Sequence, residues 1–345
     1  MQKNIQNIQN IRIGIVGLGR LGKRHAEALA FKTRHCELIA ACSPVPSELA
    51  HAQEQLGVKR LYADYAELLA DADVDAVVLV TPTNLHADQI IAALKAGKHV
   101  FVEKPLALNV EDCERVLKVA ENFPTQVAMV GFVRRFDPSY LNAYTAIADG
   151  QIGKPFLVRS QTCDLNDAEG AFMRFAPTSG GIFMDCSVHD IDLARWMLGK
   201  PRALRVFSTG TNAIHTGLAE YGDVDNGMSV VEFEGGARAV FYASRTMAHG
   251  HETSTEIFGT AGKLLVGEHG ASDRIVRSDQ HGVRHAVVKD FYERFETAFG
   301  NEMADFVAAC RGEKPLSLTL SDALEATRIG LAMTRSLHSG MPEVI

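Results

Sequence analysis

The sequence predicts a two-domain α/β protein, and three observations support this. Short apolar runs alternate with longer amphipathic stretches from residue 11 to about residue 131, and strands joined by short glycine turns follow. The length of 345 residues also exceeds one ordinary core, at about 150 residues per domain. We expect residues 1–10 to be a disordered extension, residues 11–131 the first domain and residues 132–345 the second.

The first domain is expected to contain a parallel sheet with helices on both faces. Its strand candidates are IRIGIVG, CELIAAC, VDAVVLVT, KHVFVE and TQVAMVGF. Helical periodicity lies between them, in RHAEALA, HADQIIAALKAG and VEDCERVLKVAEN. Nearly continuous Val, Ile and Leu in the strands indicate burial on both faces, because each crossover packs a helix back onto the sheet. This pattern is typical of a doubly wound fold.

The second domain is expected to be α+β with a mostly antiparallel sheet. Its strand candidates are PFLVRSQTC, ALRVFSTGT, GMSVVEFEGG, ARAVFYASR, TSTEIFGT and KLLVGE. Short turns such as FEGGARA favour antiparallel pairing. Helices are predicted over about 188–199, 291–312 and 320–338.

Composition limits the class of protein. A formal net charge of -7 without a basic cluster gives nucleic acid no electrostatic footprint. The start MQKNIQNIQN lacks the apolar core of a secretory signal, and no run approaches the ~20 apolar residues of a membrane span. Six cysteines without a CxxC pair indicate reduced thiols. We expect a cytosolic protein without nucleic-acid or membrane partners.

A glycine loop supplies the first functional signal. IRIGIVGLGRLGKRHAEAL places Gly17, Gly19 and Gly22 in G-x-G-x-x-G spacing, directly after a strand and before a helix. The first glycine makes the tight turn, the second lets a pyrophosphate approach, and the third lets helix and strand pack closely. A tight turn without a ligand is the alternative. We interpret the loop, with Arg20 and Leu21, as the dinucleotide site of a Rossmann domain.

The identity of the dinucleotide depends on the end of the second strand. Ser43 stands where a carboxylate usually binds the adenosine ribose. Without that charge a 2′-phosphate is not repelled, and Arg20 could attract one. The following PVPSE offers no Arg or Lys, which favours NAD. We expect NAD and do not exclude NADP.

Several motifs together resemble the Gfo/Idh/MocA oxidoreductase family. They are the glycine loop, VTPTNLHA (80–87), EKP (103–105), GFVRRFDPSY (131–140) and GGIFMDCSVHDIDLARWMLG (180–199), in family order over nearly the whole chain. Within that family the chain looks most like the inositol 2-dehydrogenases. The resemblance implies a Rossmann domain followed by an α+β domain with an open-faced sheet.

The resemblance places Lys104 of EKP at the catalytic site beside the nicotinamide. Physical reasoning agrees, since ligands of open α/β sheets bind at the carboxyl ends of the strands, where KHVFVE ends. Pro105 fixes the backbone as it leaves the sheet. A salt-bridged surface turn is the alternative for Glu103 and Lys104. The resemblance also implies cofactor contacts from Thr81, Pro82, Asn84, His86 and Glu103.

A second constellation lies in MDCSVHDID, where Asp185 and His189 are four residues apart and share a face if the segment is helical. The resemblance matches them to the D-x-x-x-H pair of inositol dehydrogenases. An imidazole, with an ordinary pKa of about 6.5, suits a base for the hydroxyl proton. We expect His189 to be that base, Asp185 to orient it or the substrate, and Lys104 to stabilise the developing alkoxide. Alternatively, Asp185 or Ser187 caps a helix whose His189 and Asp192 face water.

Other hydride-transfer sites fit less well. None of the seven tyrosines has a lysine four residues later, as the short-chain dehydrogenases require. A zinc site could be assembled from Asp185, Cys186, His189 and the pair His249 and His251, but no CxxC or HExxH spacing supports it. We expect no metal.

The substrate candidates come mainly from RSQTCDLNDAEGAFMRFAPTSGG, which is rich in hydroxyl-binding groups. A polyol site needs several of them, because an unpaired buried hydroxyl costs about 1–3 kcal/mol. Familiar inositol dehydrogenases carry His and Asn near Thr162 and Asp164, so a related cyclitol or a pyranose fits as well as myo-inositol. His249 and His251 either line the pocket or lie on the surface. The candidates are Thr162, Asp164, His249, His251 and, from the resemblance, Arg134; Asn166 and Asp167 lie nearby.

We therefore expect an NAD(P)-dependent dehydrogenase that oxidises a ring hydroxyl of a cyclic polyol, myo- or scyllo-inositol, to a ketone. Family members are commonly homo-oligomers through the open sheet face, which implies a dimer or tetramer. An aldose dehydrogenase of the same family is one alternative. A non-catalytic dinucleotide sensor is the other, and it has no use for Lys104, Asp185 and His189 together.

Overall fold

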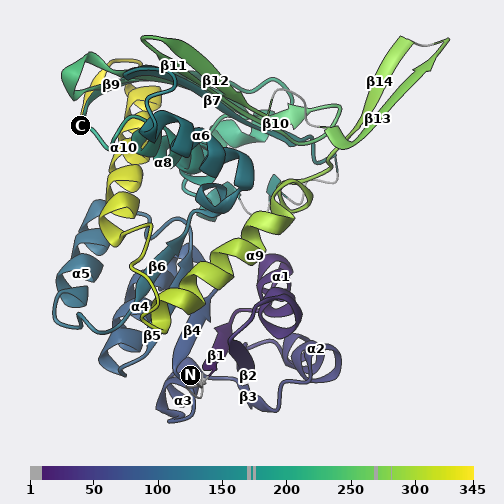
Figure 1. The fold of residues 1–345 in the computed structure, drawn as a ribbon, viewed down its shortest axis with the longest axis vertical. Helices are drawn as coiled ribbons and strands as arrows, with labels where there is room; N and C mark the ends of the chain where they lie inside the picture. The colour runs from purple at the N-terminus through teal and green to yellow at the C-terminus, as the bar shows by residue number, and fades with distance from the viewer. Residues whose placement is uncertain (1–9, 169–171, 174–175, 268–270, 281) are drawn as a thin grey trace, which may run out of the picture. The chain divides into compact units, whose positions relative to one another are not determined.

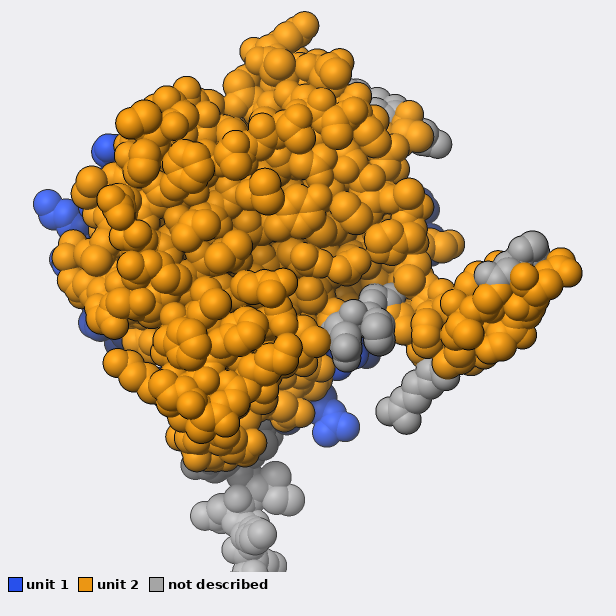
Figure 2. Space-filling view, turned by 90° about the horizontal axis from the view of Figure 1, so that it is seen from above, with its two compact units in different colours: residues 1–133, 297–324 blue, residues 134–296, 325–345 orange. Residues whose placement is uncertain are grey.

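The computed structural model describes residues 10–168, 172–173, 176–267, 271–280 and 282–345. The chain folds into two compact units, which Figure 1 shows as ribbons and Figure 2 as space-filling surfaces. Unit 1 runs to Val133 and also contains Thr297–Leu324, while unit 2 comprises Arg134–Glu296 and Glu325–Ile345. The predicted extension, residues 1–10, lies outside the described residues except for Asn10.

Unit 1 contains a six-stranded sheet in the order β3-β2-β1-β4-β5-β6 (Figure 1). All neighbouring strands are parallel, which confirms the predicted doubly wound sheet. The central strands β4 and β5 are almost completely buried, as their unbroken apolar sequences predict. In chain order the strands are β1 (Ile11–Val16), β2 (Cys36–Cys42), β3 (Arg60–Tyr62), β4 (Ala76–Leu79), β5 (His99–Glu103) and β6 (Ala128–Gly131).

The helices of unit 1 begin with clear local signals. Asp64 caps α3 by accepting a hydrogen bond from Ala66 N–H, and Asn109 caps α5 through Asp112 N–H. Pro46 opens α2, where a missing N–H costs nothing. The helices are α1 (Arg20–Glu27), η1 (Ala28–Lys32), α2 (Pro46–Leu56), α3 (Tyr65–Ala70), η2 (Thr83–Leu85), α4 (His86–Lys95) and α5 (Val110–Ala120), with parts of α9 (Phe291–Cys310) and α10 (Leu320–Ser339).

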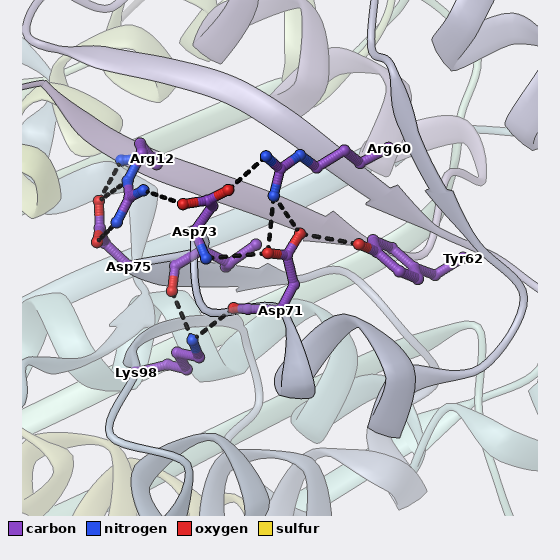
Figure 3. A network of polar contacts seen from close by, with 8 residues as sticks. Arg12, Arg60, Tyr62, Asp71, Asp73, Asp75 and Lys98 are labelled. Carbon is purple, nitrogen blue, oxygen red and sulfur yellow. Dashed lines mark hydrogen bonds and ion pairs between the residues drawn. The ribbon is translucent and has the colours of Figure 1, made fainter.

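A polar network joins residues of β1 and β3 to the segments just before β4 and β5 (Figure 3). Arg12, near the start of β1, bonds Asp75 just before β4 at 2.8 Å. Burial alone would raise the pKa of Asp71, but hydrogen bonds from Arg60 and Tyr62 help lower it to about 2. The network therefore stabilises the sheet near the amino ends of β1, β4 and β5. The carboxyl ends of these strands, where ligands of such sheets bind, take no part in it. Its labelled members are Arg12, Arg60, Tyr62, Asp71, Asp73, Asp75 and Lys98.

Unit 2 contains a seven-stranded sheet in the order β12-β11-β7-β10-β9-β8-β15. The predicted mostly antiparallel arrangement is confirmed, although β7 and β10 pair in parallel. The FEGGARA segment joins β9 to β10, and Gly235 and Gly236 there have φ of 74° and 85°. The strands are β7 (Pro155–Leu165), β8 (Ala203–Thr211), β9 (Asn226–Phe233), β10 (Arg238–Met247), β11 (Glu252–Gly259), β12 (Gly262–Val266) and β15 (Glu343–Val344).

Helices cover one face of this sheet, and a separate hairpin extends from the unit (Figure 1). The hairpin consists of β13 (Ala271–Asp279) and β14 (Gly282–Val287), which the sequence did not predict. The predicted helices over 188–199, 291–312 and 320–338 correspond to α8, α9 and α10. The remaining elements are η3 (Val133–Phe136), α6 (Pro138–Ala148), η4 (Ala176–Thr178), η5 (Phe183–Ser187), α8 (Val188–Met197), η6 (Thr216–Tyr221) and η7 (Glu234–Gly236).

Candidate functional site

The glycine loop in unit 1 has the geometry of a phosphate cradle. Gly17 has φ of 86°, and a Cβ there would lie 2.4 Å from the Val80 carbonyl oxygen. A Cβ on Gly22 would lie 2.0 Å from the Gly17 carbonyl oxygen. A Cβ on Gly19, in contrast, would meet no atom within 4 Å. Packing therefore requires the outer two glycines, and the middle one leaves open backbone where α1 begins with Arg20 and Leu21.

A carboxylate that sequence reasoning missed lies beside this loop. Ser43 occupies the expected ribose position after β2, and its hydroxyl donates to Glu48 Oε2 at 2.5 Å. The backbone N–H of Leu18, inside the loop, also donates to Glu48 Oε2, at 3.3 Å. Glu48 stands in the first turn of α2. It thus places a negative charge beside Ser43, and its carboxylate is an acceptor suited to a ribose hydroxyl and unfavourable for a 2′-phosphate.

The loop after β4 is tied to the EKP turn. His86, buried at the start of α4, contacts the Thr81 carbonyl oxygen at 3.0 Å and the Pro105 carbonyl oxygen at 2.9 Å. Burial lowers the pKa of His86, and a neutral ring can donate to only one of these two acceptors. Pro82 and Asn84 are exposed in this loop. One buried imidazole therefore links the predicted cofactor segment to the EKP turn.

EKP begins with Glu103, the last residue of β5. Glu103 is 7% exposed, so the surface salt-bridge interpretation is wrong. Its carboxylate lies 2.7 Å from His25 Nε2 and accepts the Lys104 backbone N–H at 3.1 Å. Lys104 is half-buried, and its peptide bond to Pro105 is cis. The Glu103 carboxylate thus anchors the backbone at Lys104.

In unit 2, Asp185 and His189 lie on consecutive helices, η5 and α8. Arg245 on β10 donates to Asp185 Oδ2 at 3.0 Å and to Asp223 Oδ2 at 2.9 Å. Arg245 carried no sequence signal, because its partners come from distant segments. His189 is half-buried. Asp185 is therefore a carboxylate fixed by a buried guanidinium one helical turn from an imidazole.

The helix-cap interpretation of this segment is wrong. The N-cap residue Ser187 makes no side-chain cap hydrogen bond, and Asp185 bonds Arg245 instead. Asp192 does not face water, since it is 1% exposed and pairs with Arg135 at 2.6 Å.

Two predicted substrate residues brace α8. Arg134 donates to Asp190 Oδ1 at 2.7 Å and to Thr162 Oγ1 at 2.6 Å. Thr162 in turn donates to Asp190 Oδ2 at 2.6 Å. All three side chains are buried. The triangle fixes the helix that carries His189.

The other substrate candidates fall into two places. Asp164, whose side chain is 39% exposed, lies 2.8 Å from Nδ1 of the buried His251. His249 is more than half exposed and lies 3.2 Å from Glu252 Oε2. The Cys186 thiol lies 3.8 Å from Asp164 Oδ2 and 4.0 Å from Asp185 Oδ2. The structure thus brings Asp164, His251 and Asp185 into one region and leaves His249 at its surface.

Within the described part of the chain, no helix is both long and apolar enough to span a bilayer.

Comparison with known proteins gives matches to both parts of the chain. A family described as "Oxidoreductase family, NAD-binding Rossmann fold" (GFO_IDH_MocA) matches residues 11–132. The GFO/IDH/MocA C-terminal domain matches residues 140–265.

Individual relatives cover nearly the whole chain. The scyllo-inositol 2-dehydrogenase (NAD(+)) of Bacillus subtilis is 35% identical over 332 residues, 96% of this chain and 95% of the relative. The myo-inositol 2-dehydrogenase of Thermotoga maritima is 34% identical over 330 residues, 95% of this chain and 96% of the relative. The crystal structure of Lactobacillus casei scyllo-inositol dehydrogenase with NAD(H) and scyllo-inositol matches with a TM-score of 0.94 and 36% identity, covering 97% and 99% of the two chains.

Proposed function

Since the chain belongs to the Gfo/Idh/MocA family and is an NAD-dependent oxidoreductase resembling the inositol 2-dehydrogenases, we propose that it oxidises a ring hydroxyl of myo- or scyllo-inositol to a ketone. The observation that carries this proposal is the position of Lys104, directly after the carboxyl end of a parallel strand whose sheet also carries the glycine loop. The similarity to two inositol dehydrogenases over at least 95% of the chain supports the substrate class.

The proposed chemistry assigns one task to each residue. Bound NAD supplies the acceptor for the hydride that leaves the reacting carbon. His189 accepts the hydroxyl proton as the C–O bond becomes a carbonyl, and the Lys104 ammonium stabilises the negative charge that develops on oxygen. Asp185, fixed by Arg245, orients the imidazole or a neighbouring hydroxyl. In reduction of the ketone, His189 returns the proton.

We assign substrate recognition to Asp164 and His251. Their contact at 2.8 Å joins an accessible carboxylate to a buried ring, an arrangement that accepts and orients hydroxyls. Arg134 and Thr162 act indirectly, because they bond Asp190 and so fix α8, which carries His189. His249 is exposed, and of these candidates we least expect it to contact the substrate.

Initial rates on myo-inositol, scyllo-inositol and several aldoses, with NAD and NADP in parallel, test the proposal. We expect the highest kcat/KM with NAD and one of the two inositols. A preference for an aldose would assign the same chemistry to another sugar. Tight NAD binding without turnover on any polyol would establish a dinucleotide sensor instead.

Glu48 is expected to set the preference for NAD. Glu48→Gln removes the charge that repels a 2′-phosphate, so the ratio of kcat/KM for NAD over NADP should fall about tenfold, as the loss of one charged interaction of about 1.4 kcal/mol predicts. Glu54→Gln, at an exposed position of the same helix, is the matched control. An unchanged ratio in Glu48→Gln would place cofactor selection elsewhere.

We also propose a homo-oligomer, a dimer or tetramer, built on the open face of the unit 2 sheet. Exposed Phe207, Val230 and Val240 are paired across β8, β9 and β10, and exposed Met228 lies two residues before Val230 on the same face of β9. Apolar side chains gathered on one face mark an interaction surface. Light scattering should give a mass of two or four chains, and Met228→Lys with Val230→Lys should reduce it. A monomeric mass for the unaltered protein would contradict this.

A further inference from the structure

A buried cluster of three titratable side chains lies beneath the strand end that carries Lys104. His25 comes from α1, Glu103 from β5 and Glu302 from the part of α9 that belongs to unit 1. They are 1%, 7% and 0% exposed. One ring nitrogen or carboxylate oxygen of each residue lies within 4.8 Å of those of the other two. Nothing in the proposed chemistry uses Glu302.

Both carboxyl oxygens of Glu103 have a partner. One of its oxygens lies 2.7 Å from His25 Nε2, and the other accepts the Lys104 N–H at 3.1 Å. Gly131, at the end of β6, leaves the necessary room, because a Cβ there would lie 3.3 Å from the Glu103 carboxyl carbon and 2.8 Å from Phe101.

Glu302 has a different environment. Neither of its carboxyl oxygens has a hydrogen-bond partner among the described residues, and both are fully buried. Aromatic rings close the region, since His25 packs against Phe101 and Phe299 with ring centroids 5.5 Å and 5.4 Å apart. Burial, and then the charges of Glu103 and Asp305, raise the pKa of Glu302 well above its ordinary value.

We propose that Glu302 is a neutral carboxylic acid in the folded protein and that, by carrying no charge next to Glu103, it lets Glu103 keep the contact that positions the Lys104 backbone. The cluster then carries one negative charge instead of two, and Glu103 keeps the contact to the Lys104 backbone. This inference rests on the proposed function in one respect, the catalytic role of Lys104. The protonation of Glu302 does not depend on it.

The charges facing Glu302 all favour the neutral acid over a second carboxylate. Glu103 on β5 repels it, and Asp305 on α9 itself adds negative charge, although Asp305 is paired with Lys314. His25 on α1 is already directed to Glu103. An ionised Glu302 would push Glu103 away from its two partners, and the turn at Lys104 would lose its anchor.

A direct measurement of the proton tests the first half of the proposal. Infrared spectra at pH 7 should contain a protonated-carboxyl C=O band that shifts in D2O and is absent from Glu302→Gln. The band should persist in Glu296→Gln, an exposed position on the same helix. Absence of the band from the unaltered protein would overturn the proposal. So would a stoichiometric divalent cation that Glu302→Gln loses, because this residue set could also ligate one.

The pH dependence of unfolding gives an independent check with a defined sign. An acid whose pKa is raised by folding stabilises the fold fully below its unfolded pKa, about 4.5 for glutamate, and progressively less as the pH rises. From pH 5 upward, the equilibrium constant for urea unfolding of the unaltered protein should therefore rise about tenfold per pH unit relative to that of Glu302→Gln, until the folded pKa is reached. A constant ratio would contradict a buried proton.

Turnover tests the positioning role. Glu302→Gln keeps a neutral polar group next to Glu103, whereas Glu302→Leu keeps only volume, so kcat should be about tenfold higher in the Gln variant, a change of about 1.4 kcal/mol in the barrier. The dissociation constant for NAD should be equal in both. Equal kcat in the two variants would reduce Glu302 to a space-filling group. If neither the variants nor the unaltered protein oxidise a polyol, the proposed function fails, while the infrared and unfolding results still decide the state of Glu302.

Discussion

Replacement of Lys104 with Met is expected to lower kcat by about 10²- to 10³-fold, the loss typical of one group that stabilises a developing oxyanion. The methionine has a similar length but no charge, so the negative charge that develops on the substrate oxygen would lose the stabilisation proposed for Lys104. The backbone contact to Glu103 does not involve the side chain and should persist. The Kd for NADH, measured by fluorescence, should therefore change little.

A matched variant separates this effect from a general loss of positive charge. Lys95→Met removes an exposed lysine at the end of α4 in the same unit, and it should leave kcat unchanged. A Lys104→Met enzyme with unaltered kcat would remove the lysine from the mechanism. A large loss of NADH affinity would instead indicate that Lys104 chiefly binds cofactor.

Much of unit 1 could be predicted because its signals are local. Each central strand is a short run of Val, Ile and Leu, and the glycine loop fixes its own geometry through contacts between Gly17 and Gly22. Parallel pairing follows from the helices between the strands, which force a crossover after each one.

The side chains that complete the site could not be predicted, because their partners are distant in sequence. Glu48 reaches the glycine loop only once α2 packs against α1 and β2, and Arg245 meets Asp185 only where η5 packs against β10. The parallel pairing of β7 with β10 has the same origin, since hairpin turns specify only neighbours along the chain. In the sequence, Glu302 is one of several polar residues in the segment that forms α9. Only the folded structure shows that it is buried next to Glu103.

The second large effect is expected at His189. Replacement with Ala removes the group that accepts the hydroxyl proton, and kcat for polyol oxidation should fall by about 10²- to 10⁴-fold, the range for loss of a general base. The helix should persist, because Asp190 and Asp192, which follow His189 in α8, remain bonded to Arg134 and Arg135. NAD affinity should therefore be retained.

The shape of the pH profile distinguishes a base from a group that only fills space. In the unaltered enzyme, oxidation requires the neutral imidazole, so kcat/KM should rise with pH as the ring loses its proton. His189→Ala should lose that rise, and added imidazole should restore part of the rate. Asp185→Asn should keep the rise while lowering kcat, because it leaves the imidazole in place and alters only its orientation. A rise that survives in His189→Ala would assign the base to another group, and Asp185, held by Arg245 at 3.0 Å, would then be the first alternative to examine.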